Sequence, residues 1–326
     1  MQRRDFNLAA LASLLASQGI AATSAHAQAP NLGKLKVMIP ANPGGGWDQT
    51  GRNLAVAMQA AGVISGAQFE NKGGAGGTLG LSQFINNAKG DGSALMLGGM
   101  VMVGGIMLSK STVDLTMVTP IARLTSEYVV IVVPASSPHK NLGDLLKAFK
   151  ANPGAVSWGG GSAGGTDHIL VGLVAQAIGA DTAKINYVPF KGGGEAIAAI
   201  IGGHVTAGVS GLGEFAEQIK GGRMRALGVS GPEAIDGIPS LKENGVDVVL
   251  GNWRGCFGGP GLTPAQRDAL VAAVKAATET KEWQETLAKL GWTPWFLGGD
   301  DYKKFLDEDI TRVGGILESL GLIKKT

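Results

Sequence analysis

Residues 34–48 read KLKVMIPANPGGGWD, and this stretch decides the fold. A short apolar run at 34–39 leads into a loop of proline and glycine, and apolar residues then recur at helical intervals from 50 to 58. A strand, a glycine-rich turn and a helix in this order predict a βα unit. The backbone N–H groups of its turn then gather at the start of the helix.

The same order of strand, glycine-rich loop and helix recurs three times. Residues 68–71 lead into KGGAGGT at 72–78, residues 156–158 into GGGSAGGT at 159–166, and residues 185–190 into KGGGE at 191–195. Strands that alternate with helices predict an α/β fold with largely parallel sheets. The 53 glycines among 326 residues agree with many tight turns.

A second apolar run, ALMLGGMVMVGGIML at 94–108, is too short for a membrane span. As a helix it would be about 22 Å long, against a hydrocarbon core of roughly 30 Å. Two Gly-Gly pairs also interrupt it. We expect a buried strand followed by the start of a helix, with Met96, Met100, Met102 and Met107 in the core.

The N-terminal segment 1–27 has the features of an export signal. Arg3 and Arg4 are followed by an apolar stretch at 8–22 and by Ala25-His26-Ala27, a small-x-small cleavage site. The sequence therefore predicts a periplasmic protein. The paired arginines fit a twin-arginine signal and an ordinary secretory signal equally, and this choice stays open.

The roughly 300 residues that follow exceed what one core usually supports, so two domains are expected. Extended runs at 128–133 and 246–250 are the predicted crossings between them. Domain 1 then consists of 28–130 together with 252–326, and domain 2 of 131–251. Asn141 is a predicted helix cap, and Thr263 to Gln266 a capping box.

Composition excludes several classes of protein. Lys and Arg number 28 against 26 Asp and Glu, a net charge of +2, so binding of nucleic acid is not expected. Cys256 is the single cysteine, which rules out an internal disulfide, and the four widely spaced histidines do not resemble a metal site. We expect a buried Cys256 and no metal or cofactor.

The glycine loops predict an anion site. Amides at a helix start, helped by a partial charge of about +0.5, can hold a carboxylate without many lysines or arginines. One such loop is equally consistent with a plain βα connection, but four in one cleft favour an organic acid as the ligand.

Two enzyme motifs occur within one loop. Residues 159–164 match G-x-G-x-x-G, so an exported NAD(P)-dependent oxidoreductase is the alternative function, although the next strand ends in Phe190-Lys191 without the acidic residue that holds a ribose. Residues 160–164 match G-x-S-x-G, but no histidine follows His204 to complete a hydrolase triad. Ser162 and Thr166 fit better as hydroxyl donors to a ligand or as helix caps.

Other single residues each have two interpretations. Arg254 follows the second extended run and either clamps a carboxylate or lies exposed. Asp48 caps its helix or reaches a ligand hydroxyl, and Glu195 has the same ambiguity. Trp47 either walls the cleft or fills the core, and His168 is expected on a helix face near the cleft.

Together these segments resemble the receptors of tripartite tricarboxylate transporters, also called the Bug family. The resemblance rests on PANPGGGWD at 40–48, KGGAGG at 72–77, SPHKNL at 137–142, GGSAGGT at 160–166 and YVPFKGGGE at 187–195, and it covers nearly the whole chain after 27. It implies a monomeric, non-enzymatic, two-domain periplasmic binding protein of the type II, or Venus flytrap, class. Two crossover strands would form its hinge, and it would pass a carboxylated solute to integral-membrane transporter subunits.

The resemblance also implies the ligand contacts. They come from the first loop, the second loop, the serine-containing loop, the loop after Tyr187 and the arginine: Asn42, Gly44, Gly45, Gly46, Trp47, Asp48, Gly76, Gly161, Ser162, Gly165, Thr166, Lys191, Gly192, Gly193 and Arg254. The triple glycine at 44–46 and the Arg254-Gly255 pair are most similar to the tricarboxylate-binding branch. Phe-Pro-x-Gly-Gly, common in the first loop of the family, is replaced here by Pro-Ala-Asn-Pro-Gly-Gly-Gly. A tricarboxylate such as citrate, a mono- or dicarboxylate, and an aromatic acid all stay open as the solute.

Overall fold

The computed structural model describes residues 30–191 and 193–324. The predicted export signal and Gly192 lie outside these residues. No helix in the described part of the chain combines the length and apolarity needed to cross a bilayer.

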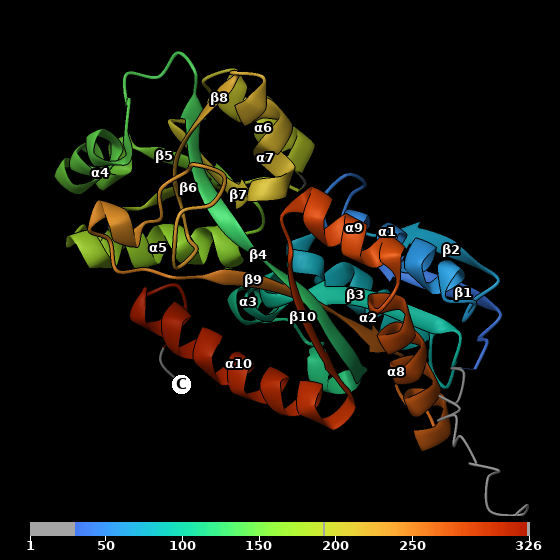
Figure 1. The fold of residues 1–326 in the computed structure, drawn as a ribbon. Helices are drawn as coiled ribbons and strands as arrows, with labels where there is room; N and C mark the ends of the chain where they lie inside the picture. The colour runs from blue at the N-terminus through green and yellow to red at the C-terminus, as the bar shows by residue number, and fades with distance from the viewer. Residues whose placement is uncertain (1–29, 192, 325–326) are drawn as a thin grey trace, which may run out of the picture.

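The strands form one mixed sheet in the order β2-β1-β3-β9-β4-β7-β5-β6, with β8 and β10 both paired to β4 (Figure 1). The strand bounds are β1 Lys34–Ile39, β2 Gly66–Asn71, β3 Ala94–Gly99, β4 Thr119–Pro134, β5 Ser157–Gly160, β6 Asn186–Pro189, β7 Ala207–Gly211, β8 Met224–Val229, β9 Gly251–Gly258 and β10 Thr293–Gly298.

Helices follow most strands. They are α1 Gly46–Ala60, α2 Thr78–Asn87, α3 Met100–Ser109, α4 Leu142–Ala151, α5 Thr166–Ile178, α6 Gly193–Ile201, α7 Leu212–Lys220, α8 Pro264–Thr278, α9 Lys281–Leu290 and α10 Gly299–Ser319, with short 3-10 turns between them such as η1 Ala75–Gly77. The predicted strand-to-helix units are confirmed, including β3 and α3 in the apolar run. The predicted caps are confirmed as well: Asn141 accepts the N–H of Asp144, and Thr263 and Gln266 form the capping box of α8.

Parallel pairing is confirmed only for the outer strands. β1 pairs in parallel with β2 and β3, and β5 with β6 and β7. The central strands β4 and β9 are antiparallel to each other and to their other neighbours. The expectation of largely parallel sheets is therefore wrong at the centre.

Strand β4 runs through both halves of the sheet (Figure 1). Its first part, up to Tyr128, pairs with β9, and its last part, from Val129, pairs with β7 and β8. Alternate residues in the second part enter two different apolar clusters, with Ile131 in the larger and Val130 and Val132 in the smaller. Burial on both faces explains why the sequence there is apolar without alternation.

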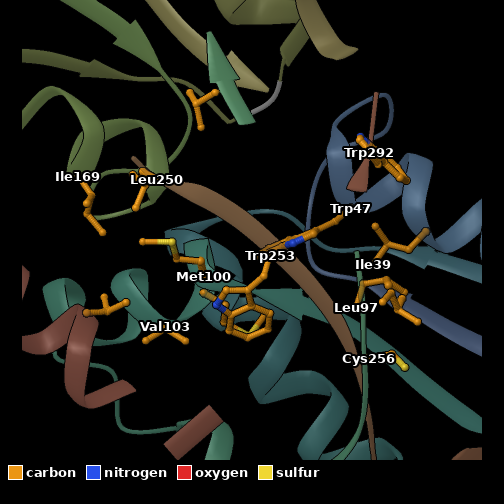
Figure 2. Packing of buried hydrophobic residues seen from close by; sticks show 14 of the residues in the cluster. Ile39, Trp47, Leu97, Met100, Val103, Ile169, Leu250, Trp253, Cys256 and Trp292 are labelled. Carbon is orange, nitrogen blue, oxygen red and sulfur yellow. The ribbon is translucent and has the colours of Figure 1, made fainter. Parts of the chain in front are cut away.

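The chain returns to the first half through residues 246–250. The predicted extended run at this place is not a strand, and the pairing begins one residue later, where Gly251 opens β9 opposite Tyr128. The division into domains at 131 and 251 remains a prediction. Figure 2 shows Trp253 of β9 between Ile169 and Leu250 on one side and Ile39 and Leu97 on the other.

Buried methionines and tryptophans fill the larger cluster. Met96, Met100 and Met102 are fully buried and Met107 packs against the cluster, as the sequence predicted. Cys256 is also buried, as expected, and burial raises the pKa of its thiol to about 12, so it stays protonated at neutral pH.

Candidate functional site

A cleft of about 420 Å³ lies where the two halves of the sheet meet. Within each half of the sheet the carboxyl ends of the parallel strands share one edge, so the loops after β1 and β2 form one wall of this cleft and the loops after β5 and β6 form another. All four glycine loops contribute to its wall. The predicted convergence of these loops is therefore confirmed by the structure.

Eight predicted site residues line the cleft: Gly45, Gly46, Trp47, Gly76, Gly161, Ser162, Lys191 and Arg254. Asn42, Gly44, Asp48, Gly165 and Thr166 do not line it; Gly192 lies outside the described residues, and for Gly193 at the start of α6 the contact stays a prediction. Trp47 fills both of its predicted roles, because it lines the cleft and is only 8% exposed.

Close backbone contacts shape the first half of the cleft. Gly77 ends η1 with φ +95°, and a Cβ there would lie 2.8 Å from the ring of Trp47. Only glycine meets both conditions without strain, so this loop can lie directly on the tryptophan.

The helix-start amides are already paired with carboxylates. Four acidic side chains each accept an N–H from a glycine loop: Asp48 from Gly44 at 3.0 Å, Asp167 from Gly161 at 2.8 Å, Glu195 from Lys191 at 3.2 Å, and Glu214 from Gly46. The expectation that these amides are free for a ligand is wrong for those four. The sequence signal was the acidic residue in the first turn of each helix.

Asp48 is the best bound of these carboxylates. Arg52 and Asn71 also donate to it, at 2.9 and 3.0 Å. Burial raises the pKa of Asp48, but the hydrogen bonds from Arg52, Gly44 and Asn71 outweigh burial and hold that pKa below its ordinary value. Of its two predicted roles, the structure shows the one that stabilises the start of α1.

Arg254 is buried, not exposed. It lies within β9, where its side chain is 2% exposed, and its Nη2 forms an ion pair with Glu127 on the neighbouring strand β4. The guanidinium also lies 3.7 Å from Glu214 and 4.6 Å from the centroid of the Trp292 ring. Its Nη1 is buried and has no hydrogen-bond partner among the described residues.

Glu127 has a full set of partners. Asn252 donates to one oxygen at 3.2 Å, Trp292 donates to the other at 3.0 Å, and Arg254 supplies the opposite charge. The hydroxyl of Thr166 donates to Asn252 at 3.0 Å, so Thr166 connects the start of α5 to this network. Sequence reasoning missed Glu127, although a lone acid within the apolar run LTSEYVVIVV was a signal.

Asp167 and Glu214 complete the acidic side of the cleft. Burial, together with the charges of Glu214 and Glu127, raises the pKa of Asp167 to about 7. Burial and the charge of Glu127 raise the pKa of Glu214. Sequence reasoning missed both residues as cleft residues.

His168 is a packing residue beside the cleft. Its Nδ1 accepts the N–H of Gly164 at 3.1 Å, and its ring stacks on Tyr187 at 4.2 Å. Burial lowers the pKa of His168 to about 4, so it is neutral at pH 7. No group of His, Cys, Asp or Glu within 30–191 and 193–324 is arranged to hold a metal ion.

Comparison with known proteins decides the family. Residues 55–322 match the model of the tripartite tricarboxylate transporter family receptor. The chain belongs to this family. It is therefore a solute-binding receptor of a family whose members are periplasmic, and not an enzyme, which sets aside the oxidoreductase alternative.

Individual proteins agree with this assignment. A UPF0065 protein in the gbd 5' region of Cupriavidus necator is 30% identical over 99% of both chains. The periplasmic binding protein BugD has a TM-score of 0.78 at 22% identity, over 90% of this receptor and 99% of BugD. The structure of R. palustris Rpa4515 with adipate has a TM-score of 0.79 at 19% identity, over 89% and 97% of the two chains. This receptor thus has the two-domain periplasmic binding protein fold predicted from its sequence.

Proposed function

We propose that this receptor captures a small organic carboxylate in the cleft and delivers it to the integral-membrane subunits of a tripartite tricarboxylate transporter. The observation that carries the proposal is Arg254, a residue of the cleft wall whose buried Nη1 has no hydrogen-bond partner among the described residues. A buried guanidinium N–H is costly to leave unpaired, and a carboxylate is the anion that its geometry fits best.

The cleft also has the dimensions of a small-molecule site. Its volume of about 420 Å³ lies in the usual range for ligand pockets. Rpa4515, a neighbour in fold, holds the dicarboxylate adipate. Loops from both halves of the sheet face the cleft, so a bound solute would contact both.

Closure follows from the same arrangement. In our proposal, 28–130 with 252–326 and 131–251 are two domains that close over the solute about β4 and the return segment at 246–251. Closure would change the surface offered to the transporter. Export to the periplasm would be directed by residues 1–27, and the receptor would act as a monomer.

The proposed contacts follow the lining of the cleft. Gly45, Gly46, Trp47, Gly76, Gly161, Ser162, Lys191 and Arg254 contact the solute directly, while Asn42, Gly44, Asp48, Gly165 and Thr166 hold the loops in place. Gly192 and Gly193 retain their predicted role as contacts.

Calorimetry tests the proposal. The purified receptor is unfolded, dialysed and refolded to remove any bound solute, and is then titrated with citrate, tricarballylate, succinate, malate, adipate, terephthalate and the protein amino acids. We expect at least one of these carboxylates to bind with a Kd in the micromolar range or below, about 8 kcal/mol of binding free energy. Heat from none of them would contradict the proposal.

A further inference from the structure

The charges in the cleft are unbalanced. Its wall carries the carboxylates of Glu127, Asp167 and Glu214 and the guanidinium of Arg254, while Lys191 is exposed at the rim. Arg254 forms an ion pair with Glu127 and also lies 3.7 Å from Glu214, so one guanidinium is shared and the wall still carries more carboxylates than cations.

The two remaining carboxylates lie on helices of the second half. Glu214, in the first turn of α7, accepts hydrogen bonds from the hydroxyl of Ser210 at 3.0 Å and from the amide of Gly46. Asp167, in the first turn of α5, accepts the amide of Gly161 at 2.8 Å. These donors are neutral, so within the described residues the Arg254 guanidinium near Glu214 is the one cation that contacts either side chain.

Arg254 supplies an independent indication of what enters the cleft. Its side chain is 2% exposed, and its Nη1 is one of the few buried polar atoms without a partner in the described part of the chain. One end of the cleft therefore requires an acceptor, and the carboxylates of Glu214 and Asp167 can each accept further donors.

We infer that the solute is a small amino carboxylate, with its carboxylate on Arg254 Nη1 and its protonated amine between Glu214 and Asp167. This rests on the proposed function and narrows it. A di- or tricarboxylate would place a second negative charge beside two carboxylates in a largely buried site, where like charges repel strongly. An ammonium group removes that repulsion and adds charge-assisted hydrogen bonds.

Matched ligands test the inference on the unmodified receptor. 6-Aminohexanoate is compared with adipate and 4-aminobutyrate with succinate, alongside the protein amino acids and citrate, by calorimetry after removal of bound solute. We expect the tightest ligand to be an amino carboxylate, at least about tenfold tighter than every di- or tricarboxylate.

The two ways of failing are distinct. If a di- or tricarboxylate binds and every amino carboxylate is at least tenfold weaker or silent, the inference is overturned and the proposed function stands. Comparable affinities for the two classes of ligand also overturn the inference, because the carboxylates of the cleft would then not discriminate between amino carboxylates and di- or tricarboxylates. If no ligand of either class binds, both the inference and the proposed function are overturned.

Single-atom variants locate the amine. Glu214→Gln and Asp167→Asn keep an oxygen acceptor for Gly46 or Gly161 but remove the charge. Each variant should lower the affinity for the tightest-binding amino carboxylate about ten- to a hundredfold, the range expected for a charge-assisted hydrogen bond. The affinity for di- and tricarboxylates should stay the same or increase. Glu217→Gln on the exposed side of α7 removes the same charge outside the cleft and should have no effect.

Two variants keep the test decisive. If Glu214→Gln does not fold, Asp167→Asn still reports on the same amine, and the ligand ranking needs no variant. Unchanged affinity for the amino carboxylate in both variants would contradict the assignment of these two residues.

Discussion

Arg254 shows how the surroundings of one residue set its role. The sequence suggests a clamp for a carboxylate or an exposed side chain, whereas the structure buries the guanidinium against Glu127 on the neighbouring strand. Part of Arg254 therefore stabilises the fold, and Nη1 remains for a ligand. A loss of binding in an alanine variant would mix these two contributions.

A double-mutant cycle with Glu127 measures the contribution of Arg254 to the stability of the fold. Arg254→Met leaves the carboxylate of Glu127 buried without its cation, which typically destabilises a protein by about 3–5 kcal/mol. We expect that loss in urea unfolding, and partial recovery when Glu127→Gln is added, because glutamine still accepts from Trp292. An Arg254→Met variant as stable as the original would show that the ion pair does not stabilise the fold.

Asp167 should make stability depend on pH. Its folded pKa of about 7 lies above its ordinary value of 3.8, so between these values the folded state holds a proton that the unfolded state releases. Asp167 therefore makes its whole contribution to the free energy of unfolding below pH 4, and this contribution is lost as the pH rises through 7. Asp167→Asn keeps the acceptor for Gly161 and removes that loss.

Thermal unfolding checks the pH dependence. The Tm of Asp167→Asn minus that of the original should increase from pH 4 to pH 7 and then level off. His168, with its pKa of about 4, titrates in both proteins and cancels in the difference, whereas Glu214 interacts with Asp167 and contributes to that difference. If the difference in Tm stays constant over this pH range, the pKa of Asp167 is not raised.

Among the elements, α3 packs closely on the backbone of its neighbours. A Cβ on Gly104 would clash with the carbonyl oxygen of Gly164, in the loop before α5, and a Cβ on Gly105 would lie 2.8 Å from the Cα of Gly76. Both neighbours are backbone, which cannot move aside as a side chain can. The second Gly-Gly pair of the apolar run, Gly104-Gly105, thus lets α3 pack directly on loops from both halves of the cleft.

Gly104→Ala should push α3 away from the loop at Gly164. We expect a loss of about 1–3 kcal/mol in unfolding free energy, as for other overpacked sites, together with weaker solute binding. Gly315→Ala is the matched control, because that helical glycine in α10 has open space around its Cβ position. It should stabilise the receptor by about 0.5–1 kcal/mol. A neutral Gly104→Ala variant would argue against this contact.

Sequence patterns predicted most elements because hydrophobic period and turn residues are local signals. These local signals predicted β1, the strand and helix within the apolar run that became β3 and α3, and the helix caps at Asn141 and Thr263. They failed for 246–250, which is apolar but unpaired, because pairing depends on distant strands. The acidic side of the cleft was missed for the same reason: Glu127, Asp167 and Glu214 lie on three separate elements.

At the scale of the whole molecule, β4 connects the two halves of the sheet and the cleft draws loops from both. A solute that contacts both halves should therefore stabilise them together. At a concentration of a hundred times Kd, we expect about 2.7 kcal/mol of added unfolding free energy.

Scanning calorimetry with and without the tightest solute measures this coupling. The expected result is one unfolding transition that shifts upward as a unit. If two transitions appear and only one responds to solute, the site is confined to one half of the chain.

The pairing of loop amides with Asp48, Asp167, Glu195 and Glu214 has a consequence for the empty receptor. These amides already have acceptors built into the protein, so abundant bystander ions such as chloride, phosphate or acetate gain little by entering. The same carboxylates repel them. In a salt-rich surrounding the cleft should therefore bind mainly a molecule that offers an acceptor to Arg254 and, at the same time, a donor to the carboxylates of the cleft.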